Sequence, residues 1–187
     1  MFLIILIILV VLAIWGIAIY NGLVADRTHV DESWHQIDVQ LQRRNDLIPN
    51  LLNTVKGYSK FESSTLEKVT KLRTSLMNIS ADGENVDMQK LMEKSNELSN
   101  CLKSIFAVSE AYPDLKASQE YQQLMEELSN TENKIAYSRQ LYNSTVANYD
   151  QTIQQFPKNI VAKMFKFTAR EYLQVDESVK KVPEVKF

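Results

Sequence analysis

The chain has 187 residues, and its formal net charge of −2 at pH 7 lacks the basic surplus that nucleic-acid-binding proteins carry. Its 4 glycines and 4 prolines are too few for the turns of a many-stranded fold, so the composition favours a few long helices in one domain. Cys101 is the only cysteine, which excludes an intrachain disulfide and any metal site built on several cysteines.

The first twenty residues, MFLIILIILVVLAIWGIAIY, contain no charged side chain. A helix of that length rises roughly 30 Å, which matches the hydrocarbon core of a bilayer. Trp15 and Tyr20 lie toward its end, where amphipathic rings favour the membrane interface. A cleaved signal peptide is the alternative, but the stretch has no basic start and exceeds the roughly 7–15 apolar residues usual there. We therefore predict a retained anchor over residues 1–21 and a single-pass protein of the cell membrane.

Basic residues follow this anchor, and none precedes it. Arg27 comes first, and Arg43 and Arg44 lie further along the chain. Because positive charge is retained on the inner side of a membrane, this bias places the rest of the chain in the cytoplasm and the amino terminus outside.

Apolar residues spaced by threes and fours follow the anchor, a pattern that predicts amphipathic helices. The predicted helices span about 23–44, 47–79, 86–110 and 117–156. Such stripes are typical of coiled-coil-like packing, so we expect an all-α fold in which a transmembrane helix precedes an antiparallel four-helix bundle over residues 22–157. The apolar stripe of the last helix is expected to end at Phe156, just before Pro157.

The stretch QRRNDLIPNL separates the first two predicted helices. Arg43 and Arg44 suit the last turn of a helix, where cations complement the negative end of its dipole. Asn45 or Asp46 can cap the following helix, and Pro49 then falls in its first turn, where its missing N–H costs nothing. Because a proline inside a continuous helix costs on the order of 3 kcal/mol, we predict a tight turn here, with a kinked continuous helix as the alternative.

The sequence contains no glycine-rich phosphate loop, no CxxC pair and no GxSxG nucleophile turn. The two histidines, His29 and His35, flank Glu32, but their spacing does not match the zinc-binding HExxH motif. We therefore expect these residues to form a solvated helix face, and we expect no catalytic residue, no bound metal and no cofactor.

Two charged residues fall on the core-facing stripe of the last predicted helix. Glu132 and Arg139 lie two turns apart on that stripe, so each needs a partner across the bundle. The candidate partners are Asp38, Arg43, Arg44, Asp46 and Arg73. One interpretation is an internal ion-pair network that fixes the register of the helices, and the other is a cleft for a polar ligand or for the terminus of a partner protein.

Residues 158–187 form a third region after Pro157. Its first part combines an apolar face with four basic residues, Lys158, Lys163, Lys166 and Arg170. A basic amphipathic helix is typical of a membrane-surface segment, although its apolar face would also suit the end of the bundle. The closing residues, QVDESVKKVPEVKF, show no period and are expected to be a flexible tail.

Three blocks of the sequence carry a further signal: RRNDLIPNL, TENKIAYSRQLYN and the closing VPEVKF. Together they resemble the LemA family of prokaryotic membrane proteins, over nearly the whole chain. His35 and Ser118 depart from the small residue and the asparagine that are usual in the family. The resemblance implies a single-pass protein with a helical-bundle domain in the cytoplasm, and the family's magnetosome-associated branch implies organising or remodelling roles at membranes. It implies no enzymatic activity for particular residues.

The leading functional hypothesis is a non-enzymatic, membrane-tethered scaffold or interaction module that binds a protein partner or a second copy of itself, and not nucleic acid. A second hypothesis is a ligand-sensing bundle that binds a small polar molecule near Glu132 and Arg139. A third is a hydrolase that uses His29 or His35.

Overall fold

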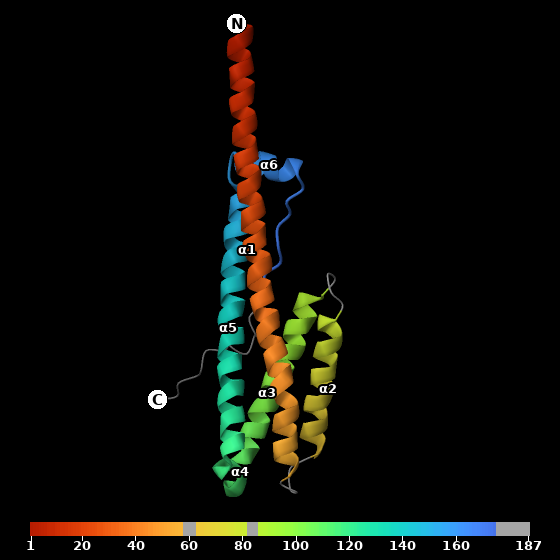
Figure 1. The fold of residues 1–187 in the computed structure, drawn as a ribbon. Helices are drawn as coiled ribbons and strands as arrows, with labels where there is room; N and C mark the ends of the chain where they lie inside the picture. Colours follow the sequence, from red (N-terminus) through yellow and green to blue (C-terminus); the bar gives the residue numbers. More distant parts are fainter. Residues whose placement is uncertain (58–62, 82–85, 175–187) are drawn as a thin grey trace, which may run out of the picture. The chain divides into compact units, whose positions relative to one another are not determined.

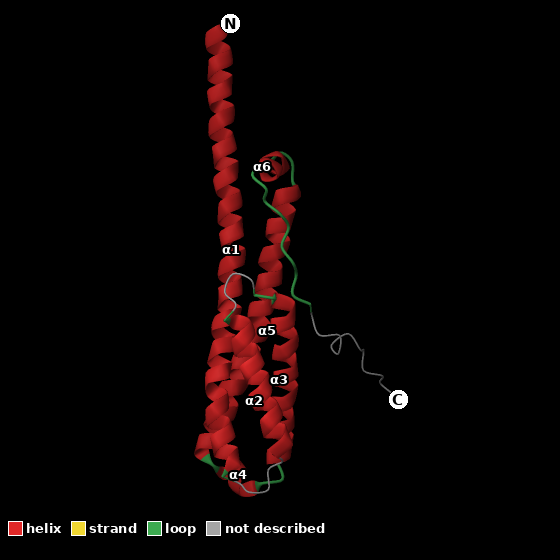
Figure 2. Cartoon of the chain, turned by 90° about the vertical axis from the view of Figure 1, so that its right-hand side faces the viewer, coloured by secondary structure: helices red, strands yellow, loops and turns green. Residues whose placement is uncertain are grey.

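The computed structural model describes residues 1–57, 63–81 and 86–174 and confirms the all-α prediction, because these residues form helices and loops and no strand (Figure 2). The helices are α1 (Phe2–Lys56), α2 (Ser63–Ser80), α3 (Met88–Ser109), α4 (Pro113–Ala117), α5 (Gln119–Gln154) and α6 (Lys158–Met164) (Figure 1). Both α3 and α5 begin and end within two residues of their predicted bounds. The predicted tail from residue 175 onward lies outside the described residues.

The apolar amino-terminal stretch is not a separate element, because α1 is one helix of 55 residues. Its apolar part is the one stretch of the described residues with the length and composition to cross a membrane. From Phe2 to Leu12 its side chains are at least half exposed, as expected for a surface that lipid covers.

The structure corrects the turn predicted between Arg44 and Leu47, since α1 continues through Pro49 to Lys56. Pro49 has no N–H to donate to the carbonyl of Asn45, one turn earlier in the helix. Arg73 of α2 fills that gap, because its Nε–H donates to the Asn45 carbonyl oxygen at 2.9 Å. The proline therefore stays inside a helix because a side chain from another helix replaces the lost backbone hydrogen bond.

We predict that Pro49 and Arg73 are energetically coupled. Arg73→Met should lower the free energy of unfolding by about 1–2 kcal/mol, because the buried Asn45 carbonyl loses its donor. In a Pro49→Ala background the restored backbone N–H takes over that role, so the same substitution should cost about 1 kcal/mol less. Denaturant unfolding of the full chain in detergent measures both values. If Arg73→Met costs the same in both backgrounds, the Arg73 side chain does not replace the backbone N–H that Pro49 lacks.

The described residues divide into two compact units, and α1 and α5 contribute to both. The first, here called the bundle unit, contains the described residues of Ile37–Tyr137 together with Leu173. In it the second half of α1, then α2, α3 and the first half of α5 alternate in direction, which makes the antiparallel bundle that the sequence predicts (Figure 1). Its core consists of apolar residues on the inward faces of these helices, for example Ile48, Leu76 and Leu98, each at most 1% exposed.

The second unit, here called the anchor unit, contains Met1–Gln36 and Ser138–Tyr172. Leu23 of α1 and Val161 and Ala162 of α6 form its buried cluster, and Ile19 and Ile153 pack against it. The views in Figures 1 and 2 show α6 running across the direction of α1 rather than along it. Because α5 ends at Gln154, the helical period no longer directs Phe156 inward, and Phe156 is 79% exposed instead of closing the apolar stripe.

A Schellman-type turn ends α6 and sends the chain back. The N–H of Phe167 donates to the carbonyl of Ala162 at 2.9 Å, and Lys166 adopts the left-handed conformation, with φ 57°. The following segment is held to the two long helices by Arg170, which pairs with Asp31 of α1 at 3.0 Å and donates its backbone N–H to Asp150 of α5 at 3.1 Å.

Candidate functional site

The most buried charge of the bundle unit is Arg44, which is 0% exposed as a whole residue. Leu41 and Ile48 precede and follow it at three and four residues, so Arg44 occupies a core-facing position of the α1 stripe. A guanidinium group cannot lose its charge in a protein, so its donors must be met by acceptors inside the bundle.

Three side chains from two other helices supply those acceptors. Nη1 of Arg44 donates to Oε2 of Glu132 on α5 and to Oγ of Ser99 on α3, each at 2.9 Å. Nη2 donates to Oγ of Ser95 at 2.7 Å. The Ser99 hydroxyl lies 2.8 Å from Oε1 of Glu132 and completes the Arg44 cluster, which we define as Arg44, Ser95, Ser99 and Glu132.

The two charges of this cluster differ in burial. The Arg44 side chain is 1% exposed, whereas the Glu132 side chain is 40% exposed. Water therefore reaches the carboxylate and lowers the cost of its desolvation, while the guanidinium depends on the protein for its hydrogen bonds. This geometry ties three helices together at one level of the bundle.

The remaining residues predicted for this network lie at different places. Arg43, next to Arg44 in the sequence, points outward and pairs with Glu127 of α5 at 2.6 Å, with both side chains close to half exposed. Asp38 is half-buried and Asp46 is exposed, both on α1. Arg139 is half-buried and belongs to the anchor unit, whereas Glu132 belongs to the bundle unit.

Ser95 and Ser99 were not among the residues predicted from the sequence. The sequence does contain a sign of these two residues. The buried stripe of α3 contains Leu91, Leu98 and Leu102, and the two serines interrupt it at a spacing of four residues. A serine in a helix often donates to a carbonyl of its own helix, as Ser99 does to Ser95 at 3.0 Å, so its role toward Arg44 becomes visible only in the structure.

The two arginine–glutamate pairs offer a matched comparison between buried and exposed charge. Glu132→Gln should lower the free energy of unfolding by about 2–3 kcal/mol, because it leaves the buried Arg44 charge without its counter-ion. Glu127→Gln removes an exposed pair and should cost below about 1 kcal/mol. Denaturant unfolding of both variants, followed by circular dichroism, measures the difference, and equal losses would show that Glu132 is not the counter-ion on which Arg44 depends.

The histidine-containing face of α1 is exposed. Nδ1 of His29 lies 3.2 Å from Oε2 of Glu32, with both side chains more than half exposed, and His35 is also exposed. Within residues 1–57, 63–81 and 86–174, no three His, Cys, Asp or Glu side chains come together in a way that could hold a metal ion.

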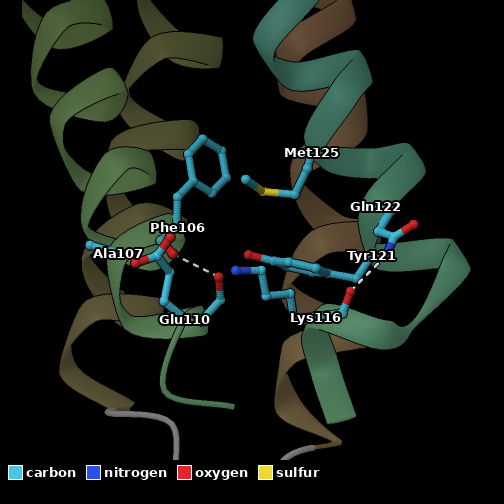
Figure 3. A pocket seen from close by; sticks show the side chains of 8 residues that line it. Phe106, Ala107, Glu110, Lys116, Tyr121, Gln122 and Met125 are labelled. Atoms are coloured by element: carbon cyan, nitrogen blue, oxygen red, sulfur yellow. Dashed lines mark hydrogen bonds between the residues drawn. The ribbon is translucent and has the colours of Figure 1, made fainter. Parts of the chain in front are cut away.

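A pocket of about 540 Å³ opens in the bundle unit where α3 ends and α5 begins (Figure 3). Phe106 and Met125 face each other across it, and Glu110 of α3 and Lys116 of α4 bring opposite charges to its lining. The whole lining consists of Phe106, Ala107, Ser109, Glu110, Lys116, Tyr121, Gln122 and Met125. An apolar recess with a few polar groups is the usual form of a binding site, and sequence reasoning did not find it.

Tyr121 lies in this pocket with a buried hydroxyl that makes no hydrogen bond to the described residues. Burial raises the pKa of Tyr121, and the neighbouring Ser109 hydroxyl acts against that rise. The Ser109 hydroxyl donates its own proton to the Phe106 carbonyl at 2.7 Å. The pocket is therefore lined by a tyrosine whose hydroxyl is buried and has no hydrogen bond to the described residues.

Comparison with known proteins identifies the LemA family over most of the chain. Residues 33–187 match the sequence model of the LemA family. The chain is 29% identical over 143 residues to a protein named LemA from Metamycoplasma hominis, an alignment that covers 76% of this chain. It is 24% identical over 175 residues to magnetosome protein MamQ 2 of Paramagnetospirillum magneticum and 22% identical over 173 residues to magnetosome protein MamQ of Magnetospirillum gryphiswaldense, with 83% and 82% of this chain covered.

These alignments cover 63%, 64% and 64% of the respective relatives, so the chain spans somewhat less than two thirds of their length. The family match includes all four residues of the Arg44 cluster, the pocket and α6.

Proposed function

Because the chain belongs to the LemA family, we propose that it acts as a non-enzymatic, membrane-tethered scaffold that binds a protein partner through its bundle unit. The observation that carries this proposal is the pocket between the end of α3 and the start of α5. Its apolar walls suit an aromatic or aliphatic anchor side chain, and the Tyr121 hydroxyl suits a backbone or polar group beside that anchor.

The apolar first part of α1 supports this proposal, because attachment to a membrane lowers the affinity that the pocket needs for its partner. A span that holds the bundle at the membrane confines it to a thin layer, where partners in or on the same membrane are concentrated. A pocket that would give modest affinity in free solution then gives useful occupancy.

A ligand-sensing role at Glu132 has less support. Both Nη groups of Arg44 donate to Ser95, Ser99 and Glu132, and the pocket has a different lining. A polar ligand at Glu132 would have to break hydrogen bonds to a buried charge, which is costly.

The names of the relatives described above support the non-enzymatic part of the proposal. The name LemA designates no reaction, and MamQ is named as a magnetosome protein. Together with the apolar stretch of α1, this supports our proposal that the chain contributes to the organisation of a membrane.

Site-specific photo-crosslinking tests the pocket as the partner-binding surface. A photoreactive amino acid at Ala107, which lines the pocket, should give a covalent adduct with a protein in native membranes. The same group at the neighbouring Val108, which is exposed and outside the lining, is the matched control and should give several-fold less adduct.

Phe106→Ala should abolish the adduct from Ala107, because it removes an apolar wall of the pocket. An adduct with a second copy of the chain would identify self-association as the interaction. Equal yields from Ala107 and Val108, or a yield unaffected by Phe106→Ala, would contradict the proposal.

We also propose that the bundle unit faces the cytoplasm. The first charged residues after the span include Arg27, whereas no charged side chain precedes Asp26. In a Cys101→Ser background, a cysteine at the exposed Lys134 should react with a membrane-impermeant maleimide only after the cells are permeabilised. Labelling in intact cells would place the bundle on the outer side.

A further inference from the structure

The anchor unit fixes α6 at the level where α1 leaves its apolar stretch. Residues 2–25 of α1 carry no charged side chain, and the first charged residue of the helix is Asp26. The α6 residues Val161 and Ala162 pack against Leu23, just before that boundary. The aromatic rings agree with this placement, since the centroid of Phe165 lies 4.7 Å from that of Tyr20. If the apolar part of α1 spans the bilayer, α6 lies at the surface of that bilayer.

The direction of α6 suits this level. It runs across α1, so a helix α1 that crosses the membrane leaves α6 close to the membrane plane (Figures 1 and 2). Helices at a lipid–water interface lie in that plane, with apolar side chains directed into the acyl boundary.

The outer face of this segment is apolar, and most of its surface is exposed in the described residues. While Val161 and Ala162 point inward, four large apolar side chains are more than half exposed: Phe156, Ile160, Met164 and Phe165. Large apolar groups gathered in this way on a short segment indicate a contact with another phase or molecule. The adjoining surface is the apolar part of α1, so lipid is the occupant that the geometry favours.

The charge of the segment points to the same occupant. Lys158, Lys163 and Lys166 lie among these apolar residues, and no acidic residue occurs from Gln151 to Arg170. Basic residues beside an interfacial apolar face are attracted by anionic headgroups. Arg170 does not belong to this set, although the sequence suggested it, because it pairs with Asp31 at 3.0 Å.

We propose that Phe156–Lys166 forms a second membrane contact that inserts its apolar side chains at the acyl boundary and binds anionic lipid headgroups through Lys158, Lys163 and Lys166. This contact is independent of the partner-binding pocket, which lies in the bundle unit. It would hold the end of α5 at the bilayer and so fix the anchor unit to the membrane at two points of the chain.

Fluorescence depth measurements on the full chain test this proposal. In a Cys101→Ser background, an environment-sensitive label is attached to a cysteine at Ile160 of α6 or, as the control, at the exposed Gln140 of α5, about 20 Å along the helix from its end. The protein is reconstituted into phosphatidylcholine vesicles with or without phosphatidylglycerol. With phosphatidylglycerol, the Ile160 label should show a blue-shifted emission and several-fold stronger quenching by shallow spin-labelled lipids than the Gln140 label.

The charge requirement is tested by replacing Lys158, Lys163 and Lys166 with Gln. This triple variant should lose most of the gain in quenching that phosphatidylglycerol gives, whereas Gln at the exposed Lys68, Lys71 and Lys134 of the bundle unit, with the same change in charge, should not. A label at the exposed Met164 provides a second position if the Ile160 variant loses the helical content of the parent.

Three results would overturn the proposal. The first is an α6 label as accessible to water as the Gln140 label. The second is quenching of the α6 label that stays the same without phosphatidylglycerol and in the triple lysine variant. The third is a label shielded in native membranes but not in pure lipid vesicles, which would show that a protein covers this face instead.

Discussion

The bundle unit depends on the placement of one charge that cannot be neutralised. Arg44 is fully buried at a position where its helix would otherwise present an apolar side chain, so the bundle must supply acceptors from two other helices. The serines of α3 and the carboxylate of α5 do so only in one register, since a shift of either helix by a single turn would leave the guanidinium with unmet donors. Apolar stripes alone tolerate such shifts more easily.

The same arginine depends on the continuity of α1. Had the chain turned after Arg44, as the proline led us to predict, the side chain would lie at a helix end, where water supplies acceptors. The contact of Arg73 with the Asn45 carbonyl keeps α1 helical beyond Pro49, and the apolar residues of the next turns, such as Leu51 and Leu52, then stay in the core. Two arginines from different helices therefore support one stretch of α1, one by its charge and the other by a single N–H group.

The sequence was sufficient for features that depend on periodicity. The all-α class, the antiparallel bundle and the positions of α3 and α5 follow from apolar spacing, because a long helix gains most of its stability by burying an apolar stripe against its neighbours. The continuity of α1 was missed because the compensating donor lies on α2, far from Pro49 in the sequence. Glu132 was found as a charge on a core stripe, but Ser95 and Ser99 were not, since a serine becomes informative only once the buried donor beside it is known. The pocket and the exposure of Phe156 depend on how helices end, which periodicity does not describe.

The family match covers the features that depend on particular side chains more fully than the apolar stretch, which depends only on composition. A membrane span needs only length and apolar character, so many sequences serve equally well, and the match begins at Ser33, beyond the uncharged stretch of α1. The Arg44 cluster, the Asn45 carbonyl with its Arg73 donor, the pocket around Tyr121 and the contact of Arg170 with Asp150 all lie within the matched region. Each of these features requires particular side chains at particular distances. In the helices that follow the uncharged stretch, a substitution at one of these positions would therefore break a specific contact, whereas one apolar residue can replace another in the stretch itself.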